Sequence, residues 1–174
     1  EQTAQGIEVK YVLDLRGFPG TPIEHKVIHD FEKIRTDEEV RIVVETMGGL
    51  NPAYPWVKAC LEAGGHNILH MCKTDVNFDR YDSYKGLYSI ANWGIYETGM
   101  SLAEGRKRFT DCAIMGGLSN HKGPLIEGTP DEIRQEVRRV MAEAGETGFI
   151  LGTDCTIPMG VPYERMRIAA EAAK

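Results

Sequence analysis

The stretch Thr129-Pro130-Asp131-Glu132 begins a segment in which a strong helix signal is followed by a strand signal. The stretch combines an N-cap residue, a proline at the first helical position and acidic side chains in the first turn. Such a start predicts a helix that runs to Ala144 and stops at Gly145. Phe149 to Leu151 follows as a short apolar strand. A helix followed by a strand is the repeating unit of an α/β fold.

The same rhythm extends over most of the chain. Apolar alternation and branched side chains predict strands at Ile7 to Leu13, Arg41 to Thr46, Asn67 to Cys72, Leu87 to Ala91, and Cys112 to Met115. Helical spacing and caps predict helices at Glu24 to Arg35, Pro55 to Ala63, Ser101 to Phe109, and Pro162 to Ala173. Gly116-Gly117 is expected to stop the strand before it. The alternation predicts a parallel sheet with helices outside it.

One segment gives two conflicting signals. Thr36-Asp37-Glu38-Glu39 has the spacing of a helix capping box. The branched side chains of Arg41 to Thr46 favour a strand instead, and a strand is the interpretation we adopt.

Length and charge limit the classes of protein. The chain has 174 residues, 42% of them hydrophobic, which suits a single α/β domain over residues 1–174. The net charge is −6 and the basic residues are scattered, so no nucleic-acid partner is expected. No apolar run approaches the roughly 20 residues of a membrane span and no signal peptide is evident, so we expect a cytoplasmic protein. Because the chain begins at Glu1, a fragment or a processed product is also expected.

His70-Met71-Cys72 is the chain's most specific chemical motif. Residues two apart on a strand point to the same face, so His70 and Cys72 can bind one metal ion. Cys155, in the segment Gly152 to Pro158, is a third possible ligand at the end of another apolar run. A His/Cys/Cys set favours zinc, and three protein ligands leave the open position of a catalytic site.

Plainer roles compete with the metal-binding one. His70 and Cys72 could be ordinary buried strand residues, since cysteine is among the most buried residue types. Cys60 and Cys112 are expected to be packing residues. Four unevenly spaced cysteines fit metal ligands and buried thiols better than a disulfide framework.

The chain from about Pro55 to its end resembles the carboxyl-terminal half of the uroporphyrinogen decarboxylase superfamily. The segments that carry the resemblance are Asn67 to Cys72, Gly116-Gly117, Glu127 to Ile133, Gly148 to Gly152, and Cys155 to Pro158. The resemblance implies a (β/α)8 TIM barrel, of which this chain would hold about half, because such barrels have about 250 residues. Residues 1–54 remain unassigned.

Within that superfamily, the zinc-dependent corrinoid methyltransferases carry the His-x-Cys motif and a distant cysteine. By that resemblance His70, Cys72 and Cys155 match the Zn²⁺ ligands through which catalysis would proceed. The resemblance further implies a methylcobalamin or other corrinoid on a partner protein and a small-molecule methyl donor or acceptor.

Several polar or aromatic residues follow the ends of the expected strands. Those expected to bind substrate are Trp93, Glu97, Asn120, His121 and Asp154. For Trp93 and Glu97 a structural role fits equally well, and Asp154 could simply form a loop turn.

Two other functions remain open. A metal-free decarboxylase of a tetrapyrrole acid would need a cavity lined by arginines, and no arginine cluster follows the expected strands. A non-catalytic assembly module is the second alternative, because half a barrel exposes sheet edges that must be covered. Pairing of two copies into a homo-oligomer would cover them.

Overall fold

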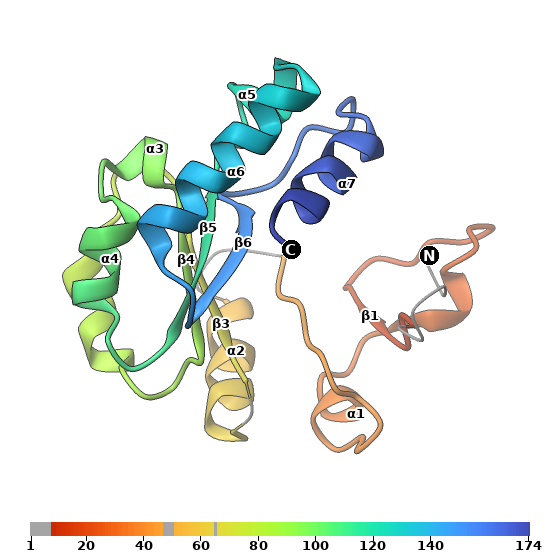
Figure 1. The fold of residues 1–174 in the computed structure, drawn as a ribbon. Coiled ribbons are helices and arrows are strands. Elements are labelled where there is room, and N and C mark those ends of the chain that lie inside the picture. The colour runs from red at the N-terminus through yellow and green to blue at the C-terminus, as the bar shows by residue number, and fades with distance from the viewer. Residues whose placement is uncertain (1–7, 47–50, 65) are drawn as a thin grey trace. The chain divides into compact units, whose positions relative to one another are not determined.

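A four-stranded parallel sheet organises residues 66–174 in the computed structural model, which describes residues 8–46, 51–64 and 66–174 (Figure 1). The strands are β3 (Ile68–Met71), β4 (Ile90–Trp93), β5 (Ala113–Leu118) and β6 (Phe149–Thr153), adjacent in sequence order. All three neighbouring pairs are parallel. The expected α/β architecture with a parallel sheet is therefore confirmed, and the strand order is that of consecutive strands in a (β/α)8 barrel.

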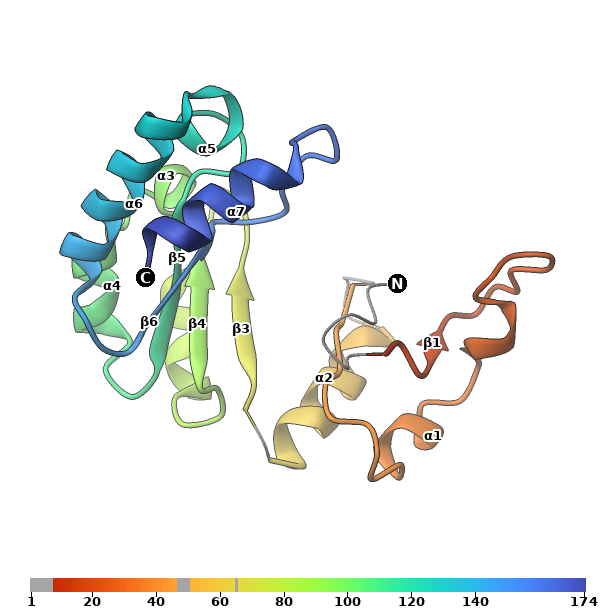
Figure 2. The same ribbon diagram turned by 45° about the vertical axis from the view of Figure 1, so that its right-hand side comes forward.

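Helices cover one face of this sheet (Figure 2). They are α3 (Ile95–Thr98), α4 (Leu102–Arg108), α5 (Pro124–Glu127), α6 (Pro130–Ala144) and α7 (Tyr163–Ala172), and a 3-10 helix, η3 (Phe78–Tyr84), precedes β4. Helix α4 contacts β5, and α6 contacts both β5 and β6. Both α4 and α6 begin with the predicted capping boxes, and α6 ends at Ala144 before Gly145 as predicted.

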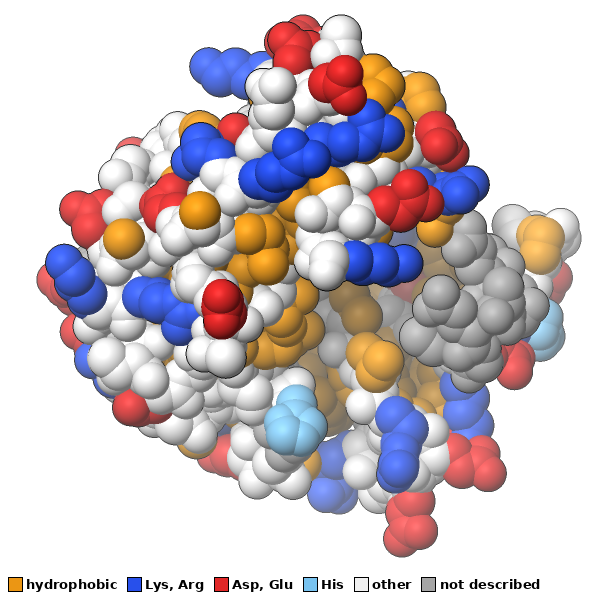
Figure 3. Space-filling view, in the orientation of Figure 1, with side chains coloured by type: hydrophobic (Ala, Val, Ile, Leu, Met, Phe, Trp, Pro, Cys, Tyr) orange, Lys and Arg blue, Asp and Glu red, His pale blue; other side chains and the backbone are white. Residues whose placement is uncertain are grey.

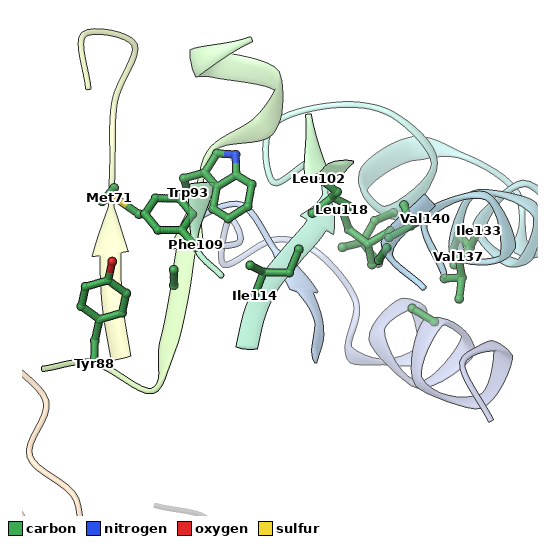
Figure 4. Packing of buried hydrophobic residues seen from close by; sticks show 14 residues of the cluster. Met71, Tyr88, Trp93, Leu102, Phe109, Ile114, Leu118, Ile133, Val137 and Val140 are labelled. Atoms are coloured by element: carbon green, nitrogen blue, oxygen red, sulfur yellow. The ribbon is translucent and has the colours of Figure 1, made fainter. Parts of the chain in front are cut away.

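The hydrophobic core lies between the sheet and these helices (Figure 4). Trp93 of β4 is fully buried, and its ring centroid lies 5.4 Å from that of Phe109. A Cβ atom on Gly105 of α4 would lie 2.1 Å from the Trp93 ring, so only glycine allows the helix to approach the indole this closely. Val137 and Val140 of α6 belong to the same core, and neither side chain is exposed to solvent.

Two predicted strand boundaries were wrong. Strand β4 covers residues Ile90–Trp93 rather than Leu87 to Ala91. Strand β5 continues through Gly116-Gly117 to Leu118, with Gly117 paired with Gly152 of β6. At Gly117, φ is +102° and a Cβ atom would lie 2.4 Å from Cγ1 of Val140. Glycine is therefore required by close packing of α6, and it does not end the strand.

The residues up to Gly64 form a separate compact unit. The chain divides into two compact units after Gly64, and each is described by itself. The elements of the first unit are β1 (Val12–Leu13), η2 (Glu24–Lys26), β2 (Val27–Ile28), α1 (Glu32–Arg35) and α2 (Ala53–Glu62). Strands β1 and β2 are parallel.

The sequence predicted this first unit poorly. The helix expected at Glu24 to Arg35 is wrong, because the β-branched pair Val27–Ile28 joins β1 as a strand and interrupts it. The strand expected at Arg41 to Thr46 is also wrong, since these residues have no regular structure. Of the strand expected at Ile7 to Leu13, only Val12–Leu13 is formed, and Ile7 lies outside the described residues. The helix near Pro55 is confirmed as α2.

The longest described helix, α6, has 15 residues. Within the described ranges, no helix combines the length and the apolar character that crossing a membrane requires.

Candidate metal centre

Three side chains with metal-binding atoms meet at the carboxyl end of the sheet. The Sγ atoms of Cys72 and Cys155 are 3.3 Å apart. Sγ of Cys155 lies 3.4 Å from Nε2 of His70, and one ligand atom from each of the three residues lies within 4.8 Å of the others. The structure therefore brings together the three residues that the sequence singled out.

Strand β3 and the segment after β6 hold these side chains. His70 lies within β3, and Cys72 follows the last residue of that strand, Met71. Cys155 follows the end of β6 at Thr153. These strands are the two edges of the sheet, and in a flat sheet three interstrand spacings would separate them by about 14 Å. The sheet and its carboxyl ends must therefore curve around the face that carries His70.

The two distances from the Cys155 sulfur to the other ligand atoms are close to those of a zinc site. Zinc binds cysteine sulfur at about 2.3 Å and histidine nitrogen at about 2.1 Å, usually with tetrahedral angles. These values require a sulfur–sulfur distance of about 3.8 Å and a sulfur–nitrogen distance of about 3.6 Å. The observed sulfur–sulfur distance of 3.3 Å is about 0.5 Å shorter than this value, and the observed sulfur–nitrogen distance of 3.4 Å is about 0.2 Å shorter. His70 and Cys72 are exposed and Cys155 is half-buried, so solvent and a fourth ligand have access.

The contact between the two thiols gives them different proton affinities. The hydrogen bond to Cys155 raises the pKa of Cys72, and burial and the nearby charges of Cys155 and Glu97 raise it further. Burial raises the pKa of Cys155, but its polar contacts, led by the hydrogen bonds from Cys72 and from the backbone of Thr156, outweigh burial and lower the pKa below its ordinary value. Cys155 is therefore the thiol nearer to the thiolate form that binds metals.

Asn92 of β4 lies beneath His70 and was not singled out from the sequence. It is 3% exposed and stands opposite His70 in the register of β3 and β4. Its Oδ1 atom contacts Nδ1 of His70, and its Nδ2 atom donates to the carbonyl of Met115 at 2.8 Å. The signal that could have found it is a polar residue inside an apolar segment, because a buried amide needs partners.

Asp154 anchors the segment that carries Cys155. The side chain is 1% exposed, and its Oδ2 atom accepts a hydrogen bond from the backbone N–H of Tyr96 at 3.2 Å. Its own N–H donates to the carbonyl of Leu118 at 2.9 Å. Burial raises the pKa of the Asp154 carboxyl to about 6, against the opposing effect of the Tyr96 hydrogen bond. The structure thus places Asp154 beside the centre but beneath the surface.

Three other predicted residues form a connected group. Asn120 is 2% exposed and donates from Nδ2 to the carbonyl of Thr156 at 3.0 Å, next to Cys155. Its neighbour His121 places Nε2 3.0 Å from Oε1 of Glu97. The His121 side chain is 64% exposed, so this group extends from the buried Asn120 side chain to solvent.

Trp93 lies on the opposite side of the sheet from the ligands. It is 0% exposed, and its Nε1–H donates to the carbonyl of Met100 at 2.8 Å. Trp93 is therefore a residue of the hydrophobic core, and its ring is not accessible to a substrate.

A hollow of about 320 Å³ lies near the end of β5. Tyr96, Ser119, Lys122 and Glu136 contribute to its wall, but none of the three candidate ligands does. The candidate centre is thus on an open face of the sheet rather than inside this hollow.

The fold and the site define an α/β protein with a group of three metal-ligand side chains at the carboxyl end of a parallel sheet. The chain belongs to the uroporphyrinogen decarboxylase (URO-D) family, whose model matches residues 54–174, and members of this superfamily are mostly enzymes. This match confirms the superfamily resemblance and its start near Pro55. No curated protein gives a match to the chain.

Proposed function

We propose that this chain is a zinc-dependent methyltransferase that moves a methyl group between a corrinoid protein and a thiol or similar acceptor. The main support is the convergence of His70, Cys72 and Cys155 within 4.8 Å, with both contacts of the Cys155 sulfur close to the distances of a tetrahedral zinc site. Family membership is compatible with a decarboxylase or a methyltransferase-like activity. The His/Cys/Cys set favours the second, because a decarboxylase of this superfamily does not need it.

His70, Cys72 and Cys155 would hold the zinc ion and leave its fourth position free. Zinc bound in this way lowers the pKa of a thiol in the open position, so that the nucleophilic thiolate is present at neutral pH. Asp154 and Asn120 fix the backbone on both sides of Cys155, through Tyr96 N–H and the Thr156 carbonyl. These hydrogen bonds keep the Cys155 sulfur close to the ligands of β3.

We assign to Glu97 and His121 the role of contacting the methyl acceptor. Their contact of 3.0 Å and the exposure of the imidazole allow the pair to accept the acceptor's thiol proton and pass it to solvent. The thiolate would then form the new S–C bond, and a methyl donor bound on a partner protein would release the methyl group and keep the electron pair of the broken bond. Asn120 and Asp154 position this side of the site.

The openness of the centre suits a methyl donor carried by a protein. His70 and Cys72 are exposed on a face that no helix of residues 66–174 covers (Figure 2). A partner-bound corrinoid needs such access, because a protein surface cannot enter a closed pocket. We infer that β3–β6 form half of a (β/α)8 barrel, completed by a longer chain or by a second copy in a homo-oligomer.

Metal analysis tests the ligand assignment. The purified chain should bind one zinc ion, and X-ray absorption should report two sulfur ligands and at least one nitrogen ligand. Cys72→Ala, Cys155→Ala and His70→Ala should each lose most of the zinc, while the matched control Cys112→Ala should retain it. Stoichiometric zinc in Cys155→Ala would overturn the assignment.

Decarboxylation is the second candidate function, because the chain belongs to the uroporphyrinogen decarboxylase family. An activity assay separates it from methyl transfer. With free methylcobalamin and a small thiol, the zinc-loaded chain should demethylate the corrinoid, and chelation should abolish this activity. Decarboxylation of uroporphyrinogen that persists in the chelator would support the decarboxylase instead.

A further inference from the structure

Asn92 has an environment that determines which atom of its side-chain amide faces His70. The residue lies on β4 between His70 on β3 and Met115 on β5, and all three are in register. Gly116 leaves room for the amide, because a Cβ atom there would lie 3.3 Å from Nδ2 of Asn92. A buried amide in the middle of a sheet must satisfy both its donors and its acceptor.

Two carbonyl groups fix the orientation of the amide. One end of the Asn92 side chain faces the carbonyl of Met115 at 2.8 Å and that of Thr153 at 3.3 Å. Carbonyl oxygens only accept hydrogen bonds, so this end must be the NH₂ group. The oxygen atom, Oδ1, therefore faces His70. An oxygen in that place can only accept.

The ring of His70 must then carry its proton on Nδ1. An unprotonated Nδ1 would place a lone pair against the Oδ1 lone pairs and leave Asn92 without its third hydrogen bond. In the neutral ring this choice leaves Nε2 without a proton. Nε2 is the nitrogen that lies 3.4 Å from Sγ of Cys155.

We propose that Asn92 is the positioning residue of this centre, which holds His70 in the Nδ1–H tautomer and turns the Nε2 lone pair toward the Cys155 sulfur. The effect of Asn92 on metal affinity rests on the proposed function, whereas the tautomer of His70 is a property of the metal-free chain. Hydrogen bonds of this kind fix ring orientation and raise ligand basicity, and their loss typically costs about 10–100-fold in metal affinity. Asn92 also ties Thr153 to β4, two residues before Cys155.

Two substitutions separate this role from a purely structural one. Asn92→Leu removes both the acceptor for His70 and the donors to Met115 and Thr153. Asn92→Asp keeps an acceptor for His70 but cannot donate to either carbonyl. If Asn92 serves only to tie the strands together, the two variants should behave alike. If it acts through His70, Asn92→Asp should preserve the ring tautomer and most of the metal affinity.

The first measurement is the nitrogen-15 NMR spectrum of the histidine rings in the metal-free chain, with His70 assigned by its loss in His70→Gln. We expect Nδ1–H in the wild type and in Asn92→Asp, and a shift toward Nε2–H in Asn92→Leu. The second is zinc affinity by competition with a chromogenic chelator, which should fall about 10–100-fold in Asn92→Leu and much less in Asn92→Asp.

An Nε2–H ring in the wild type would overturn the proposal, and this result needs no variant to fold. Equal losses of affinity in both variants, or an unchanged tautomer and affinity in Asn92→Leu, would also overturn it. A wild-type chain with the Nδ1–H tautomer that binds no zinc would refute the proposed function while leaving the role of Asn92 in orienting the ring intact.

Discussion

The two faces of the sheet β3–β6 differ sharply, although the same four strands supply both. On the helix-covered face, Met71, Trp93 and Ile114 are at most 1% exposed. On the other face, Ile68 is 55% and Ile150 is 42% exposed, and the candidate metal centre lies there. Hydrophobic side chains reach the surface around β6 (Figure 3).

The exposed isoleucines on the open face indicate that this sheet is built for burial on both sides. Strands of parallel sheets carry apolar residues on both faces because both are normally covered. Only one of the two faces obtains its cover from α3 to α7. The loss of folding free energy caused by truncating side chains on each face therefore reports how far the open face is covered in solution.

Trp93→Ala should produce the largest effect, because it empties the centre of the covered face. Truncation of a fully buried tryptophan costs about 3–5 kcal/mol of folding free energy. Urea unfolding followed by circular dichroism would measure the loss. Tyr163→Ala, which truncates an aromatic residue 63% exposed on α7, is the control and should change stability by about 0.5 kcal/mol or less. Comparable losses in both variants would contradict the packing described.

Gly117→Ala should be the next most destabilising change. The added methyl group would meet Val140 at 2.4 Å and would have to adopt φ of +102°. Overpacking and left-handed backbone together should cost about 2–4 kcal/mol. At Gly99, φ is +73° but no atom lies within 4 Å of the added carbon, so Gly99→Ala should cost only about 1–2 kcal/mol. Equal costs by urea unfolding would show that α6 packs less tightly on β5 than described.

Much of the covered face could be predicted because its signals are local. The caps at Ser101 and Thr129 and the stop at Gly145 depend on neighbouring residues only, and α4 and α6 form where they predict. The grouping of His70, Cys72 and Cys155 was also predicted, from alternation along β3 and the resemblance to a family.

The remaining features depend on contacts between distant segments. Asn92 faces His70 only because β3 and β4 pair in that register, and the expected end of the strand at Ala91 left Asn92 outside it. In the sequence, Gly117 indicates the end of a strand. Its actual role, to leave room for Val140 of α6, depends on a contact between distant segments. Short elements such as α3 and β2 offer too few residues for periodicity to be recognised.

Alkaline titration tests a polar contact at the edge of the covered face, where Tyr96 of α3 donates to Glu136 of α6 at 2.7 Å. Burial, and then this hydrogen bond, raise the pKa of Tyr96 to about 12. Because an unfolded tyrosine has a pKa of about 10, the stabilising contribution of Tyr96 is complete below pH 10 and is lost as the pH rises through 12.

Tyr96→Phe should therefore remove one ionisation near pH 12 from the ultraviolet absorbance titration and leave the remaining tyrosine ionisations unchanged. In Glu136→Gln, the same ionisation should move toward pH 10 while the number of steps stays constant. A missing step near pH 10 in Tyr96→Phe would show that the contact between α3 and α6 does not persist in solution.

Ile150→Ala should have the smallest effect and tests the comparison most directly. Ile150 is 42% exposed and pairs with Met115 of β5, whose neighbour Ile114 faces the core and is 1% exposed. The same truncation at Ile114 should cost about 2–5 kcal/mol, against about 1 kcal/mol or less at Ile150. Both variants remove the same atoms from adjacent strands, so the difference in their unfolding midpoints reports burial alone. A cost at Ile150 close to that at Ile114, particularly one that falls on dilution, would mean that a second copy covers the open face. The candidate metal centre would then lie at an interface between copies, and zinc binding would depend on protein concentration.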